Sequence, residues 1–145
     1  MIKYKHTQKG YLIIISFIVI MFFIANLMII HGFNWTNFLA LIIFGISLIL
    51  FSALTVIIDE DNLKIFFGFK IIHKKFSLKN IESCQIVKNP WYYGWGIRLI
   101  PNGWLYNVSG FEAIEIKMKN GKKYRIGTDV PNDFEKAIKE AIVQS

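Results

Sequence analysis

The sequence predicts a membrane-embedded helical hairpin, residues 1–54, followed by a mainly-β domain, residues 55–145, that ends in an α-helix. Three observations lead to this fold class. Of the 145 residues, 54% are hydrophobic and only 19% are charged. Two long stretches carry no charge, and the remainder breaks into short β-rich runs. This composition excludes intrinsic disorder and is too apolar for an ordinary soluble domain.

The first uncharged stretch covers residues 12–30. Its 19 residues, as an α-helix, extend about 28 Å, which matches the hydrocarbon core of a bilayer. A cleaved signal peptide has an apolar run of about 7 to 15 residues followed by a small-residue cleavage site. This run is longer and no such site follows it, so we predict a membrane-spanning helix.

The second uncharged stretch, residues 35–54, follows a short turn-rich connection and must run antiparallel to the first. Lysines flank the pair on one side only, and cytoplasmic flanks carry the lysine and arginine excess. We therefore predict a multi-pass protein of the bacterial inner membrane with both termini in the cytoplasm. Tyr11 and Trp35 lie near the span ends, where aromatic rings favour the membrane interface.

The net charge of +7 does not indicate nucleic-acid binding. Three of the excess positive charges lie in the first ten residues, and residues 55–145 hold 14 basic and 10 acidic residues, a balance of only +4. A nucleic-acid surface requires a stronger concentration of positive charge.

Short runs rich in β-formers, separated by turn residues, predict a barrel or sandwich. The expected strands are Leu54–Ile58, Leu63–Phe67, Phe69–Lys75, Ile81–Lys88, Gly96–Ile100, Trp104–Val108, Glu112–Lys119 and Lys122–Gly127.

The turn at Asn120-Gly121 can be predicted in detail. A two-residue loop would place apolar residues opposite charged ones. A three-residue loop, Lys119 to Gly121 with a left-handed Gly121, instead pairs Ile116 with Tyr124 and Ile114 with Ile126. We predict the three-residue form.

After Pro131 the apolar spacing becomes helical, and charge pairs at i,i+4 occupy the opposite face. We expect an amphipathic helix of about twelve residues that closes one end of the β domain. Its apolar face comprises Phe134, Ala137, Ile138, Ala141 and Ile142.

Several of these features together resemble the bacterial pleckstrin-homology-like domain proteins in which two transmembrane helices precede the domain. The resemblance implies a split barrel of two roughly orthogonal sheets capped by the terminal helix, and it implies a fold more than a reaction. It extends over nearly the whole chain and is carried by Trp91, Gly94, Gly96–Arg98, Gly103–Gly110 and Arg125–Asp129 ahead of Pro131.

No metal or cofactor site is expected. His6, His31 and His73 are far apart in sequence, and His31 lies on the opposite side of the predicted membrane from the other two. Cys84 lies in an alternating strand without a neighbouring histidine or basic activator, so we expect an inert buried thiol.

The densest group of aromatic residues lies between Trp91 and Tyr106 and allows three interpretations: core packing, contact with lipid headgroups, or a groove for a protein partner. Arg98 either pairs with Glu112 or Glu115 or contacts an anion. The candidate partner-binding residues are Trp91, Tyr92, Tyr93, Trp95, Arg98 and Trp104.

Phosphoinositide capture of the eukaryotic pleckstrin-homology type is not expected, because the corresponding turn, Asp59 to Asn62, holds three acids. Non-specific attraction to anionic lipid, at about 1 kcal/mol per residue near the surface, is an alternative to a solvated basic face. The candidate lipid-contacting residues are Lys3, Lys5, Lys9, Lys70, Lys74 and Lys75.

Our first functional hypothesis is a non-enzymatic interaction domain, held at the membrane, that binds a protein partner or a second copy of itself. The alternative is a small-molecule or anionic-lipid sensor, or an enzyme accessory subunit, with a pocket near Arg98 and Trp104.

Overall fold

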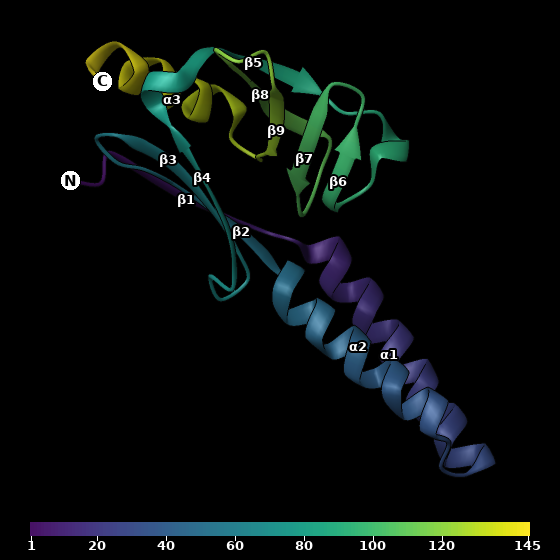
Figure 1. Ribbon diagram of the computed structural model, residues 1–145. Coiled ribbons are helices and arrows are strands. Elements are labelled where there is room, and N and C mark those ends of the chain that lie inside the picture. The colour runs from purple at the N-terminus through teal and green to yellow at the C-terminus, as the bar shows by residue number, and fades with distance from the viewer.

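The computed structural model describes residues 1–145 as two apolar helices, two β-sheets and a C-terminal helix (Figure 1). The first sheet has the order β1-β2-β3-β4, and the second has the order β5-β8-β9-β7-β6. The helices are α1 (Tyr11–His31), α2 (Trp35–Phe51) and α3 (Pro131–Gln144). The strands are β1 (Tyr4–Lys9), β2 (Ala53–Ile58), β3 (Asn62–Phe67), β4 (Ile72–Ser77), β5 (Ile81–Lys88), β6 (Gly96–Ile100), β7 (Gly103–Asn107), β8 (Glu112–Met118) and β9 (Lys123–Gly127).

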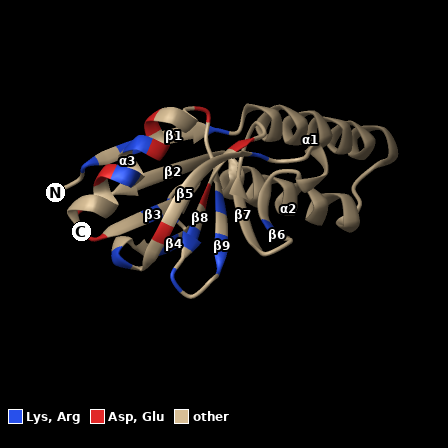
Figure 2. Ribbon diagram, turned by 90° about the horizontal axis from the view of Figure 1, so that it is seen from above, with Lys and Arg blue, Asp and Glu red and all other residues tan.

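Helices α1 and α2 run side by side and project from one end of the β domain (Figure 1). Neither buries a residue in the protein, and Figure 2 shows no acidic residue, lysine or arginine along either of them. By length and apolar composition α1 can cross a membrane, whereas α2 is a shorter apolar helix of 17 residues. The side-chain amide of Asn26 donates to the Phe22 carbonyl one turn earlier, at 2.8 Å, and so is satisfied within its own helix.

Residues 4–9 form a strand that the sequence did not predict. In β1, Tyr4 lies opposite Ile58 and Lys9 opposite Ala53, in antiparallel register with β2. The segment reads YKHTQK, which lacks the apolar alternation that identifies a strand, and its partner lies beyond the whole hairpin. The assignment of residues 1–54 to the hairpin alone therefore needs correction, because residues 4–9 belong to the first sheet.

The hairpin enters and leaves the sheet almost without linker. The backbone N–H of Gly10 donates to the Ser52 carbonyl at 2.7 Å, directly between the helix bases and the β1–β2 ladder. A Cβ at Gly10 would lie only 2.9 Å from the Val108 carbonyl oxygen, so the chain at this corner passes close to the second sheet. The predicted second span ends early for the same reason, since Ala53 and Leu54 already pair with β1.

The two sheets pack over a shared core but do not close into a barrel (Figure 1). In the second sheet β7 and β9 pair in parallel, whereas every other pair of neighbouring strands is antiparallel. Every other residue of β2 and of β3 is buried, so both strands turn one face to the core.

Most predicted strands are confirmed to within one or two residues. The exception is the third expected strand, Phe69–Lys75: residues 68–71 form a turn, and β4 starts at Ile72. The β8–β9 turn has the predicted three-residue form, with Ile116 opposite Tyr124, Ile114 opposite Ile126 and Gly121 at a φ of 85°.

The predicted terminal helix is confirmed as α3, which packs mainly against β5 and β8. Phe134, Ile138 and Ala141 are buried. On the opposite face the Glu135–Lys139 and Lys136–Glu140 pairs lie 3.1 Å and 4.0 Å apart. The helix therefore covers the core at the end away from α1 and α2 (Figure 1).

Substituting Ile138→Asp tests this seal. Ile138 is fully buried, so the variant places an unpaired carboxylate in the core, which destabilises the fold on the order of 4 kcal/mol. We expect the melting temperature in detergent to fall by at least about 10 °C. Val143→Asp, on the exposed face of the same helix, is the matched control and leaves melting unchanged. Equal melting of the two variants would show that α3 does not seal the core.

Candidate functional site

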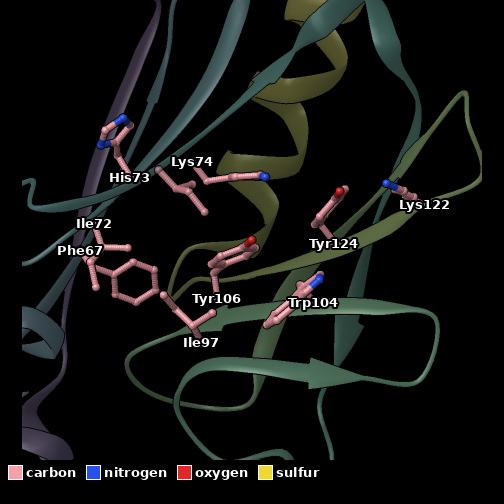
Figure 3. A pocket seen from close by; sticks show the side chains of 10 residues that line it. Phe67, Ile72, His73, Lys74, Ile97, Trp104, Tyr106, Lys122 and Tyr124 are labelled. Atoms are coloured by element: carbon pink, nitrogen blue, oxygen red, sulfur yellow. The ribbon is translucent and has the colours of Figure 1, made fainter.

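The first candidate site is a pocket of about 450 Å³ between the two sheets, which we call the inter-sheet pocket. Its volume lies within the usual range for small-ligand sites, roughly 300–1,000 Å³. Figure 3 shows side chains converging on it from β3 and β4 on one side and from the second sheet on the other. The lining residues are Ile65, Phe67, Ile72, His73, Lys74, Ile97, Trp104, Tyr106, Lys122 and Tyr124.

Strand register explains why the aromatic residues meet there. Trp104 and Tyr106 are two residues apart on β7 and so share one face. Tyr124 on β9 lies beside Trp104, and Ile97 on β6 lies opposite Tyr106, so all four project toward the first sheet. The floor of the pocket is therefore apolar and aromatic.

The rim of the pocket carries positive charge. Lys74 comes from β4 and Lys122 from the loop before β9, and no acidic residue lines the pocket. The ring of His73 lies on the other face of β4, against Phe66. The Tyr106 hydroxyl is not an available base, because burial and the neighbouring Tyr124 raise its pKa. Such a pocket can hold an apolar group that ends in a carboxylate or phosphate.

The predicted aromatic group divides between packing and exposure. The short 3₁₀ helix η2 (Trp91–Tyr93) and the residues after it fold across the outer face of the second sheet. The centre of the Tyr93 ring lies 5.8 Å from the guanidinium carbon of Arg125. The Trp95 ring lies tilted against Phe111, with ring centres 6.1 Å apart, and its N–H donates to the Gly110 carbonyl.

Trp91 and Tyr92, in contrast, are 79% and 68% exposed and contact each other edge to face. Trp104 belongs to neither group, since it lies in the inter-sheet pocket. Packing against the outer face of the second sheet therefore accounts for Tyr93 and Trp95, which are half-buried and lie outside the core, and Trp91 and Tyr92 remain available for recognition. We call residues 91–95 the aromatic loop.

A polar network holds the aromatic loop on the sheet. Glu115 is 8% exposed and accepts from Arg125 Nε at 2.9 Å, with Lys123 at 3.3 Å. Arg125 also donates to the Asn89 side-chain oxygen at 3.1 Å, at the base of the loop. Burial by itself raises the pKa of Glu115, but the hydrogen bonds and charges of Arg125 and Lys123 outweigh burial and lower it. The sequence analysis missed this network, because its members lie on β8, on β9 and in the segment that follows β5.

The expected pairing of Arg98 with Glu112 or Glu115 is wrong. Glu115 is taken by Arg125 and Lys123, and no acidic side chain pairs with Arg98. Arg98 and Trp104 also do not share a pocket: Trp104 lines the inter-sheet pocket, whereas Arg98 lines a second crevice beside α1 and α2. The reason is the pleat, since Arg98 lies opposite Leu105 and therefore faces away from Trp104.

The six predicted lipid-contacting lysines do not form one surface. Lys9 lies next to the start of α1, and Lys70 lies in the turn beside the end of α2. Lys3, however, is about 20 Å away along β1 and donates to Gln144 at 2.8 Å. Lys74 lines the inter-sheet pocket, and Lys5 and Lys75 are exposed on strands.

No three His, Cys, Asp or Glu side chains are grouped so that they could hold a metal ion. The Cys84 thiol is buried, and burial raises its pKa. His6 contacts Asp129 and so joins β1 to the start of α3.

Comparisons with known proteins found no matching family model, no similar curated protein and no similar solved structure.

Substituting Glu115→Gln tests the network beneath the aromatic loop. Because the folded-state pKa lies below the ordinary value of about 4.5, Glu115 stabilises the fold above that pH and ceases to do so as the pH falls through its folded-state pKa. We expect the variant to lose about 2 kcal/mol at pH 7.

The loss should shrink as the pH falls below about 4, and denaturant melts at several pH values measure it. Glu140→Gln, at an exposed ion pair, is the matched control and changes little at any pH. A pH-independent difference between Glu115→Gln and the native chain would contradict the assigned charge network.

Proposed function

We propose that this chain is an integral membrane protein that holds a non-enzymatic, pleckstrin-homology-like interaction domain against the cytoplasmic face of the bacterial inner membrane. The supporting observation is the insertion of the hairpin between two paired strands. Because β1 and β2 lie side by side, the first residue of α1 and the last of α2 leave the domain at the same place. Two antiparallel helices with this origin cross a bilayer and return to the same side.

Both helices fit this topology. The 17 residues of α2 extend about 26 Å, slightly less than the hydrocarbon core, and the adjoining residues reach the interface. At the far end of the hairpin, Phe33, Trp35 and Phe38 form an exposed cluster, with the first two rings 5.1 Å apart. Aromatic residues favour this interface, and the flanking lysines favour a cytoplasmic domain.

The domain architecture supports the pleckstrin-homology-like proposal. Four consecutive antiparallel strands form one sheet, the remaining strands form the second, and one amphipathic helix covers the end of the core. The parallel β7–β9 pair and the open side between the sheets are features of this chain that the resemblance does not imply.

The aromatic loop is the surface we assign to a protein partner. Exposed tryptophan and tyrosine side chains on a fixed backbone are typical centres of protein interfaces. Trp91 and Tyr92 meet this description, because Tyr93 and Asn89 fasten the same segment to Arg125. The rings of Trp91 and Tyr92 contact the partner, which is either another membrane protein or a second copy of the chain.

The inter-sheet pocket favours a second function, recognition of an amphipathic anion. Its aromatic floor and its cationic rim of Lys74 and Lys122 suit an apolar molecule with a negative end. The pocket lining offers no carboxylate or thiol for catalysis, which supports binding over reaction.

Photo-crosslinking in the native membrane tests the protein-partner proposal. We expect a photoreactive residue in place of Tyr92 to form a discrete protein adduct, and one in place of Val143, which is also exposed, to form none. Adding Trp91→Ala should lower the Tyr92 adduct yield several-fold, because the neighbouring ring is part of the same contact. Adducts with lipid alone, or no adduct from position 92, would contradict a partner at the aromatic loop.

A further inference from the structure

Arg98 occupies a second crevice, of about 530 Å³, where the hairpin meets the second sheet. The crevice is distinct from the inter-sheet pocket except that Ile97 contributes to both. Its lining residues are Ile13 and Phe17 from α1, Ser47 and Phe51 from α2, and Gly94 to Arg98 from the aromatic loop and β6. We call it the hairpin crevice.

The Arg98 side chain is held in place but not neutralised. Its Nε donates to the Trp95 carbonyl at 3.1 Å, which fixes the guanidinium beside the loop. Its two terminal nitrogens donate to no protein group, and no acidic residue lines the crevice. The other arginine of the chain, Arg125, pairs with Glu115 and donates to Asn89, whereas Arg98 has no acidic partner.

The guanidinium lies beside the backbone of Gly94, whose φ of 66° favours glycine. A Cβ there would lie 3.7 Å from a terminal nitrogen of Arg98, which is ordinary van der Waals contact. The two terminal nitrogens of a guanidinium match two oxygens of a phosphate group. The open fork therefore suits a phosphate ligand.

The crevice lies at the depth of lipid headgroups if the helices cross the bilayer as proposed. Ile13 is in the first turn of α1 and Phe51 is the last residue of α2, so both mark the cytoplasmic end of the hairpin. Phe17 and Ser47 lie about one turn deeper. A ligand at Arg98 is thus bordered by an apolar wall that continues into the acyl region.

We propose that the hairpin crevice binds one anionic phospholipid, with its phosphate on Arg98 and an acyl chain along Phe17. The inference rests on the proposed membrane topology. An anionic headgroup is favoured because the crevice has no acidic side chain to accept the ammonium of a zwitterionic lipid.

Native mass spectrometry of the full chain in detergent tests the site, with phosphatidylglycerol and phosphatidylcholine as probes. We expect one phosphatidylglycerol to bind the native chain at least about tenfold more tightly than phosphatidylcholine, a difference of about 1.4 kcal/mol. Arg98→Gln should remove most of this preference, and Arg98→Lys should restore only part of it because lysine lacks the planar fork. Lys119→Gln, which removes an exposed charge in the β8–β9 turn, should bind within twofold of the native chain.

The contradicting outcomes can be told apart. Equal phosphatidylglycerol binding by Arg98→Gln, with unchanged melting, would overturn the site. Displacement of the lipid by millimolar glycerol phosphate would show a site for free phosphate and overturn the assignment to lipid. Carbonate extraction of the native chain from membranes would refute the proposed function itself, whereas Arg98→Gln is expected to remain membrane-integrated like the native chain.

Discussion

The pairing of β1 with β2 is the constraint on which the rest of the structure depends. Hydrogen bonds between these strands close a loop that contains the entire hairpin, from Gly10 to Ser52. The entropic cost of closing a loop rises only slowly with the length of the loop. The two helices also make this loop stiff and compact. The strands therefore fix where both helices begin and end, and the helices bring the strands together.

Close packing at the same corner makes the hairpin and the β domain a single body. Phe51, at the end of α2, contacts the core residue Phe67 with ring centres 5.7 Å apart. Gly68 has a φ of 54°, and a Cβ there would collide with the carbonyl oxygen of Ile49. The β3–β4 turn is thus pressed against the last turn of α2, and its exposed Phe69 and Ile71 lie beside the helix that we propose crosses the membrane. This arrangement leaves the domain little freedom to tilt relative to the hairpin.

The sequence was sufficient to predict those elements whose structure is set by a physical rule that acts within a short segment. Charge-free length located both helices, cross-strand face matching set the β8–β9 register around Gly121, and helical spacing located α3 with Ile138 on its buried face. The strand β1 escaped prediction because its residues are polar and its partner is remote. β1 is an edge strand whose one buried residue is Gln8, so its sequence contains no alternation of apolar and polar residues that would identify a strand.

The candidate sites depend on register between distant strands, which explains why prediction was partial there. Grouping Arg98 with Trp104 was reasonable by proximity in sequence, but the pleat places them on opposite faces of the second sheet. The sequence identified the aromatic loop as a cluster, but it could not show which rings are packed. The contacts of Tyr93 with Arg125 and of Trp95 with Phe111 distinguish the packed rings from the exposed Trp91 and Tyr92. Lys122 was not a candidate in the sequence, because only the packing of the two sheets places it at one rim with Lys74.

Thiol labelling in intact cells tests the central claim most directly. The native chain gives a clean background, because its single cysteine, Cys84, is buried. With a membrane-impermeant maleimide, the account predicts that Phe33→Cys, at the exposed tip of the hairpin, is labelled from outside and that Val143→Cys, on α3, is labelled only after the cells are opened. Labelling of position 143 in intact cells, or protection of position 33 in both conditions, would contradict a hairpin that crosses the bilayer and returns to the sheet from which it left.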